Sequence, residues 1–231
     1  MDALRALGDT YAIPIVADAA AAIGARYKGR DVAATGADLT TLSFNGNKLV
    51  TAGGGGAIVS MKASDGPAFK HLTSTARVGS GYDHDRVGFN YRMTNLQAAV
   101  GVAQLERLDE FLGAKAGIAH LYAEAFAALP GVQPFPALEE SVSSHWLSGI
   151  YLPDATPEDI EALRAALIAG GVEGRPFWKP IHQQAPFSNC PQHLPGRADA
   201  LWGRIQPLPC SSQLSAHEQA QVIEVVTRAL S

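Results

Sequence analysis

The chain is poor in cysteine, with only Cys190 and Cys210 among its 231 residues. Two cysteines without a CxxC spacing do not make a disulfide framework, so we expect reduced thiols and a cytoplasmic protein. His84, His145 and His193 are scattered along the chain and lack the spacing of metal ligands. The sequence therefore predicts no metal site.

Long apolar runs and an excess of positive charge are absent as well. No run is long enough to cross a bilayer, and the first four residues (MDAL) lack the basic start of a signal peptide. The formal net charge of −4 gives no electrostatic reason to expect nucleic acid or an anionic membrane as a partner. The 47% hydrophobic and 17% charged residues are typical of an ordinary globular protein.

Short apolar runs at residues 13–17, 39–44 and 57–60 predict three buried strands. A short helix is expected at residues 1–7. Apolar strands separated by helical or irregular segments indicate an α/β fold with a parallel or mixed sheet covered on both faces.

The second half of the chain is predicted from its helix caps. Thr94 with Gln97 is a capping-box pattern that opens a helix, and a second helix is expected after Gly113. We place a domain boundary in this second helix, giving a large domain at residues 1–124 and a small α/β domain at residues 125–231.

The small domain is expected to contain one clear strand, at residues 145–152, and two capped helices. Thr156 followed by Pro157 starts one helix, and Ser215 with Glu218 starts the last one. Ile160, Leu163 and Leu167 should form the buried face of the first helix.

The predicted sheet of the large domain is short of strands. A doubly wound domain usually has about five or more strands, and the first ~90 residues supply about three. We therefore expect that another chain completes the sheet, or that the sequence is the back part of a longer protein.

Asp18 ends one predicted strand, and Lys48 lies just beyond the end of the next one. If these strands are neighbours, both side chains lie at the carboxyl edge of the sheet, where α/β folds bind ligands. A carboxylate and an amine there suit pyridoxal phosphate: the lysine forms a Schiff base and the carboxylate keeps the pyridine nitrogen protonated. Spacing alone favours the simpler interpretation, a surface lysine in an Asn-Gly turn and a helix-capping aspartate, because many α/β chains have such a pair.

The residues around this pair resemble the DegT-type nucleotide-sugar aminotransferases, a family of fold type I pyridoxal-phosphate enzymes. The stretch SFNGNK (43–48), followed by TAGGGG (51–56), is similar to the family's Schiff-base segment. The stretch VADAA (16–20) resembles its pyridine-binding segment, and YKGR (27–30) resembles a motif downstream of that segment. Further similar stretches are GFNYRMTNLQAA (88–99), QLERL (104–108), RPFWKPIH (175–182) and LPCSS (208–212).

The resemblance implies a role for each matching residue. Lys48 would form the Schiff base and carry a proton, and Asp18 would pair with the pyridinium nitrogen. Ser43 would donate its hydroxyl to the cofactor phosphate. Asn90 would reach a phosphate in the partner subunit, because the family's active sites lie at a homodimer interface. Without the resemblance, Ser43 would be interpreted as a buried strand hydroxyl and Asn90 as a turn residue.

The segment 175–182 is the candidate for contacts with the nucleotide-sugar. Arg175 could meet a phosphate, Trp178 could offer an apolar face, and Lys179 or His182 could meet sugar or diphosphate oxygens. The alternative is a proline-rich loop whose tryptophan packs and whose charges are solvated.

The implied reaction is transfer of an amino group, from glutamate, to a keto-sugar attached to a nucleotide. Details of the motifs are most similar to enzymes acting on UDP-linked 4-keto-6-deoxy amino sugars. Two departures from the family stand out: Ala21 replaces a longer polar side chain expected against the ring, and nothing before Asp18 could supply the phosphate-binding helix start. The rival hypothesis is a non-catalytic remnant that dimerises or binds a sugar nucleotide without cofactor chemistry.

Overall fold

The computed structural model describes residues 1–192 and 196–231, which divide into two units. The first contains Met1–Phe111 and Leu138–Trp146, and the second contains Leu112–Ala137 and Leu147–Ser231. The segment 138–146 therefore belongs with the N-terminal residues although it comes many positions after them. The simpler division at residue 125 stays a prediction.

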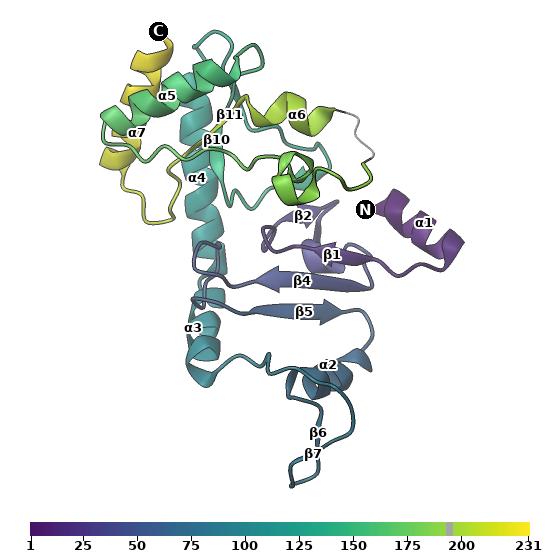
Figure 1. Cartoon of the computed structure of the whole chain (residues 1–231). Coiled ribbons are helices and arrows are strands. Elements are labelled where there is room, and N and C mark those ends of the chain that lie inside the picture. Colours follow the sequence, from purple (N-terminus) through teal and green to yellow (C-terminus); the bar gives the residue numbers. More distant parts are fainter. Residues whose placement is uncertain (193–195) are drawn as a thin grey trace. The chain divides into compact units, whose positions relative to one another are not determined.

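The central sheet of the first unit has the order β1-β4-β5, with β4 in the middle (Figure 1). These strands are β1 (Val16–Asp18), β4 (Leu39–Ser43) and β5 (Gly56–Ser60). β1 and β4 run parallel, and β5 is antiparallel to β4. The three predicted strands and the mixed α/β class are confirmed.

β1 begins later than the apolar run 13–17 predicted. Pro14 has no N–H to give to a ladder. Ile15 donates its N–H to the Asp38 carboxylate instead, at 2.8 Å. Pairing with β4 therefore starts only at Val16, which lies opposite Leu39.

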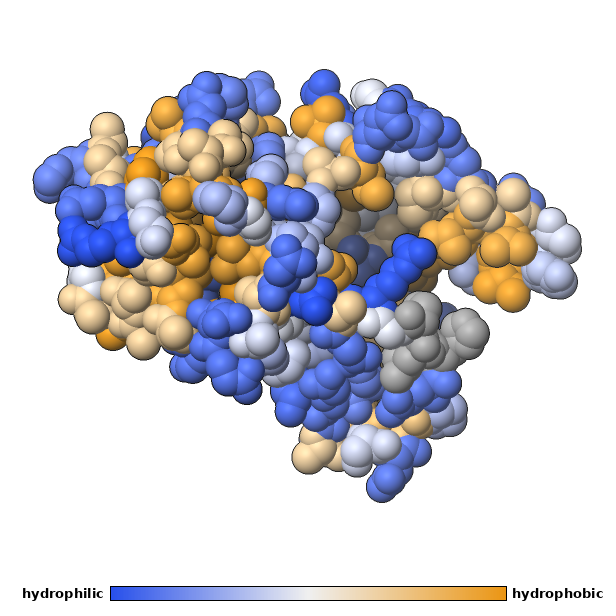
Figure 2. All heavy atoms as spheres, turned by 90° about the horizontal axis from the view of Figure 1, so that it is seen from above, coloured by the Kyte–Doolittle hydropathy of each residue, from blue (hydrophilic) through white to orange (hydrophobic). Residues whose placement is uncertain are grey.

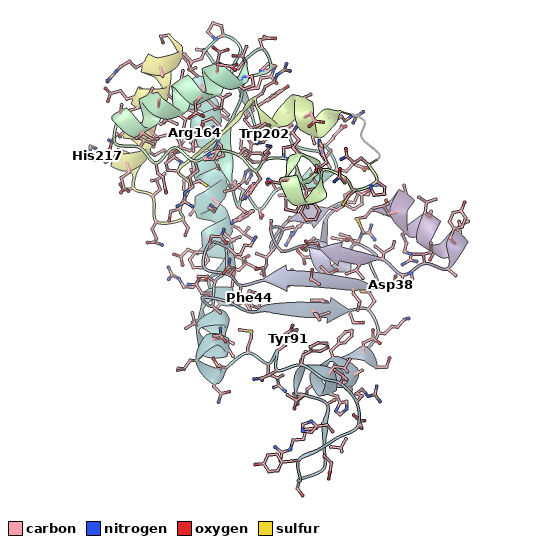
Figure 3. The ribbon with its side chains drawn as sticks, in the orientation of Figure 1. Asp38, Phe44, Tyr91, Arg164, Trp202 and His217 are labelled. Atoms are coloured by element: carbon pink, nitrogen blue, oxygen red, sulfur yellow. The ribbon has the colours of Figure 1, made fainter. Side chains whose placement is uncertain are left out.

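Asp38 joins the start of the sheet to the first helix, α1 (Asp2–Tyr11). Its Oδ2 accepts from Ile15 N and from Arg5 Nη1, both at 2.8 Å. The Ile15 N–H, followed by the Arg5 guanidinium, lowers the pKa of the Asp38 carboxyl below its ordinary value. Asp38 directly precedes β4 and is labelled in Figure 3.

We expected both faces of this sheet to be covered, and among the described residues one face is partly exposed. Val16 is 61% exposed and Ile58 is 50% exposed. On the face of the molecule that Figure 2 draws, hydrophobic groups lie at the surface between hydrophilic ones. Apolar patterning predicts which residues tend to be buried, but not whether a covering element is at hand.

Smaller elements complete the first unit. β2 (Arg26–Tyr27) pairs on one side with β3 (Arg30–Asp31) and on the other with β9 (Ser141–Val142). This second pairing holds the 138–146 segment on the unit. The other elements are the short helix η1 (Val32–Ala34), helix α2 (Asp65–Thr73), and the hairpin strands β6 (Arg77–Val78) and β7 (Asp83–His84). In Figure 1 this hairpin extends away from α2.

Helix α3 (Asn95–Leu105) begins with the predicted capping box: Thr94 and Gln97 each satisfy the other's backbone N–H. The apolar residues of this helix do not form a buried face: Leu96 is 82% exposed and Val100 is 50% exposed. Helix α4 spans Leu108–Phe126. It begins before Gly113, where we expected the helix to start, since a single glycine inside a long helix costs only ~1 kcal/mol.

The second unit packs helices on a three-stranded sheet of order β11-β10-β8. Helices α5 (Pro157–Ala169) and α7 (Ala216–Leu230) begin with the predicted caps Thr156 and Ser215. The buried face of α5 is also as predicted, with Ile160, Leu163 and Leu167 at most 3% exposed. The other elements are β8 (Gln133–Pro134), β10 (Ser148–Tyr151), β11 (Ile205–Leu208), η2 (Ile181–Gln183), η3 (Ala185–Phe187) and α6 (Arg197–Trp202).

Buried polar bonds fasten the stretch LPCSS (208–212) to α4. Lys115, only 6% exposed, donates to the Cys210 carbonyl oxygen at 2.5 Å. Tyr122 donates its hydroxyl to the Pro209 carbonyl oxygen at 2.7 Å, and burial raises the pKa of this phenol. Since buried polar groups need such partners, this motif has a structural role in the second unit. Among the described residues, no helix has both the length and the apolar character to span a bilayer.

Replacing Leu167 by alanine should destabilise the second unit. The side chain is fully buried in the core, so its truncation leaves a cavity and should cost about 2–5 kcal/mol. Its neighbour Ile168 is 61% exposed, and Ile168→Ala should change the free energy of unfolding by about 0.5 kcal/mol or less. Urea denaturation of both variants provides the comparison, and equal shifts would contradict the assigned core.

Asp38→Asn should destabilise the first unit in a pH-dependent manner. The pKa of Asp38 is lower in the folded chain than in the unfolded chain. Its stabilising contribution is therefore present above the ordinary aspartate pKa of about 4 and is lost as the pH falls through the folded value. The gap in urea midpoint between wild type and variant should be wide at pH 6 and narrow at pH 3. The exposed Asp83 provides the control, and a gap that does not narrow would exclude this linkage.

Candidate active site

The predicted neighbours Asp18 and Ser43 end adjacent parallel strands. Asp18 lies opposite Thr41 in the register of β1 and β4. Ser43 lies two positions after Thr41, and alternate residues of a strand share a face. The carboxylate and the hydroxyl therefore lie on one face of the sheet, at its carboxyl edge.

Both side chains make only local bonds among the described residues. Asp18 Oδ1 accepts from the N–H of Ala20 at 3.0 Å. Ser43 Oγ accepts from the N–H of Asn45 at 3.3 Å, which leaves its own proton available for donation. Asp18 is exposed and Ser43 is half-buried, so a ligand can reach them.

Lys48 lies in a turn directly after β4, where its N–H bonds to the Asn45 carbonyl oxygen at 3.0 Å. Its amine Nζ lies 3.9 Å from the centroid of the Trp146 ring. The indole N–H of Trp146 donates to the Asn47 carbonyl oxygen at 2.7 Å. Trp146 is a site residue that the sequence patterns did not predict. It stands 99 positions from Asn47, and no local pattern marks it.

The turn is supported by a small buried cluster of Phe44, Val50 and Ala52. Figure 3 labels Phe44 at the end of β4. The bulky Phe44 and Val50 are at most 7% exposed. Burial on both sides of the 45–48 turn fixes where the chain turns, and thus where Lys48 starts.

The glycine run 53–56 serves packing against neighbouring chain segments. A Cβ on Gly56 would lie 2.3 Å from the Leu42 carbonyl oxygen in β4. Gly55 has a φ of +84°, and a Cβ there would meet Met93 at 3.0 Å. Glycine is required where the backbone comes this close or turns left-handed. This requirement exists without any ligand.

Asn90 lies in an extended segment between Phe89 and Tyr91, whose rings stack at 5.1 Å. Its backbone forms an isolated bridge with Ser74, and its side chain is exposed. Tyr91 is labelled in Figure 3. An exposed amide can contact a second molecule, and its phosphate contact in a partner subunit stays a prediction.

The four predicted substrate contacts all belong to the second unit. Arg175 pairs with Glu173 at 2.6 Å, and His182 pairs with Asp199 at 2.7 Å. Lys179 is exposed, and Trp178 is 58% exposed. Two of the four thus have an acidic partner within this unit, and a substrate role for them stays a prediction.

Asp199 is the centre of that polar cluster. It accepts hydrogen bonds from His182 and Gln183. The His182 bond, followed by the Gln183 bond, lowers the pKa of the Asp199 carboxyl. The cluster ties η2 to α6, and so fixes the end of the predicted substrate segment.

In the part of the chain that the structure describes, no group of three or more His, Cys, Asp or Glu could hold a metal ion. His193, one of the three scattered histidines, lies outside the described residues.

Comparison with known proteins agrees with the resemblance found in the motifs. EpsN of Bacillus subtilis (strain 168) is 36% identical, over 98% of this chain and 59% of EpsN. The GDP-perosamine synthase of Vibrio cholerae is 39% identical, over 79% of this chain and 49% of that enzyme. The crystal structure of S. venezuelae DesV in complex with a ketimine intermediate superimposes with a TM-score of 0.87 at 28% identity, covering 99% of this chain and 61% of DesV.

This chain thus spans about half to three-fifths of the length of the relatives it matches. The family match itself extends over residues 1–227, nearly the whole sequence given. The motifs, the mixed α/β fold and this match lead to one conclusion: the chain belongs to the DegT/DnrJ/EryC1/StrS aminotransferase family.

Proposed function

We propose that this chain supplies the lysine-bearing part of a pyridoxal-phosphate site that transfers an amino group to a nucleotide-linked keto-sugar. One observation carries the proposal: the parallel pairing of β1 and β4 brings Asp18 and Ser43 to one edge, with Lys48 in the next turn. The relatives support the reaction class, because they include GDP-perosamine synthases and a dTDP-3-amino-3,4,6-trideoxy-alpha-D-glucose transaminase.

The chemistry of these three side chains fits the cofactor. A carboxylate with one oxygen engaged only by the Ala20 N–H can accept from a protonated ring nitrogen. The Ser43 hydroxyl can donate to a phosphate oxygen, because its bond to the Asn45 N–H uses only a lone pair. Lys48 provides a primary amine on a flexible stem.

The cofactor, when bound, supplies an electron sink for the reacting carbon. The residues of this chain would bind the cofactor and transfer protons to and from it. Asp18 would keep a proton on the ring nitrogen through its negative charge. Lys48 Nζ would form the covalent link, and, when released from it, would take up and return the proton of the reacting carbon. Ser43 would orient the phosphate.

The finer proposal names the two substrates. Glutamate would supply the amino group, and a UDP-linked 4-keto-6-deoxy amino sugar would receive it. Trp178 and Lys179, both exposed in the second unit, are available to contact the nucleotide-sugar. Arg175 and His182 would have to exchange their acidic partners for diphosphate or sugar oxygens. Asn90 would act on the phosphate bound by a second copy in a homodimer.

Pyridoxal phosphate mixed with a full-length version of the protein should form a borohydride-reducible adduct at Lys48, whereas residues 1–231 alone should bind it weakly or not at all. Lys48→Ala should abolish the accompanying visible absorbance band, whereas Lys62→Ala, which changes an exposed lysine, should not. Peptide mapping after reduction locates the adduct. An adduct spread over the exposed lysines without preference for Lys48 would refute the cofactor proposal.

Transfer from glutamate should be fastest to the UDP-linked keto-sugar when UDP-, GDP- and dTDP-linked forms are compared at equal concentration. The aminated products differ in mass from the keto-sugars, so mass spectrometry quantifies the product formed from each substrate. A product formed only from the GDP-linked sugar would replace the UDP proposal and bring the specificity into line with the GDP-perosamine synthases.

A further inference from the structure

The ring of Trp146 covers the amine of Lys48. The Nζ lies 3.9 Å from the ring centroid, well within the ~6 Å at which a cation is attracted to an aromatic face. Both residues belong to the first unit and are half-buried. The indole N–H of Trp146 is bonded to the same turn that carries Lys48, so the ring and the amine are held close together.

The chain holds Trp146 there by several independent bonds. The indole N–H donates to Asn47, the residue next to Lys48, so the ring is fixed to the turn that carries the amine. Upstream, β9 pairs with β2, and Glu140 forms an ion pair with Lys28 at 3.1 Å. The segment that presents Trp146 is thus anchored to the first unit before it reaches Lys48.

The residue before Trp146 has an unfavourable backbone conformation. His145 has a φ of +48°, in the left-handed region that favours glycine, and its N–H is held by Ser143 Oγ at 3.0 Å. This sharp turn interrupts the strand predicted for residues 145–152, and β10 begins only at Ser148. Strained conformations of this kind cost about 1–3 kcal/mol and often occur at functional sites.

We propose that Trp146 is a positioning residue, whose ring is the resting place of the Lys48 amine whenever that amine is not bonded to the cofactor. This inference rests on the proposed function for its role in the reaction. A lysine on a flexible stem would otherwise swing into solvent when released. The aromatic face attracts the ammonium without donating a proton or forming a covalent bond, and so leaves the amine ready to return.

Competitive acetylation with a trace of acetic anhydride tests the resting place directly, because it needs no cofactor. The rate at Lys48 is measured by peptide mapping relative to the exposed Lys62 and Lys70. Trp146→Leu should raise the relative rate at Lys48 roughly two- to fivefold, since the loss of a cation–π contact frees and uncovers the amine. Trp146→Phe keeps an aromatic face and should show a smaller rise.

Tyr82→Leu is the matched control. Tyr82 forms a cation–π pair with Arg77 at 4.6 Å in the β6–β7 hairpin, so the variant removes a contact of the same kind elsewhere in the first unit. It should leave the Lys48 rate unchanged. The buried Lys115 reports on folding of the second unit, because it should remain unlabelled wherever that unit is folded, and the circular dichroism of each variant reports on the chain as a whole.

An unchanged Lys48 rate in Trp146→Leu, with Lys115 still protected, would overturn the inference. If Trp146→Leu also exposes Lys115, the milder Trp146→Phe decides: an unchanged Lys48 rate there overturns the inference, and a rise with Lys115 protected supports it. Failure of the proposed function is a separate result, namely a wild-type protein in which borohydride traps no pyridoxal phosphate on Lys48. That result would not change the acetylation rate of Lys48 relative to Lys62 and Lys70, because the acetylation is measured without cofactor.

Discussion

The parallel pairing of β1 with β4 is the constraint on which the candidate site depends. Its register sets Asp18 opposite Thr41 and so on the same face as Ser43. A slip of one residue would turn every side chain of β1 to the other face and separate the carboxylate from the hydroxyl. The Asp38 carboxylate, bonded to Ile15 N and to Arg5, prevents that slip by fixing the chain where the pairing begins.

The other end of β4 is fixed by packing. Phe44 and Val50 are buried on either side of the turn, and Gly56 allows β5 to approach the Leu42 carbonyl. These contacts fix the backbone position from which the Lys48 side chain extends. Trp146 then supplies what the turn lacks, a surface for the amine, from a segment that returns to the first unit after helix α4.

The second unit is stabilised in a different manner. Its core is a helix-on-sheet cluster in which Leu167 and Val226 are fully buried. Lys115 and Tyr122 fasten the stretch LPCSS (208–212) through buried hydrogen bonds to its carbonyl oxygens. That stretch was part of the family resemblance, and its contacts give it a structural explanation. The His182–Asp199 pair similarly organises the predicted substrate segment from within.

The sequence by itself determined the features that depend on neighbouring residues. The three strands, the caps at Thr94, Thr156 and Ser215, and the family motifs around Lys48 all arise from short-range patterns, because capping and strand alternation act within a few residues. Only the tertiary structure decided which partner each side chain meets. The contact between Trp146 and Lys48 joins two segments that are distant in sequence. The apolar residues of α3, in contrast, remain exposed because no distant segment of the described chain packs on them. Neither outcome has a local signal in the sequence.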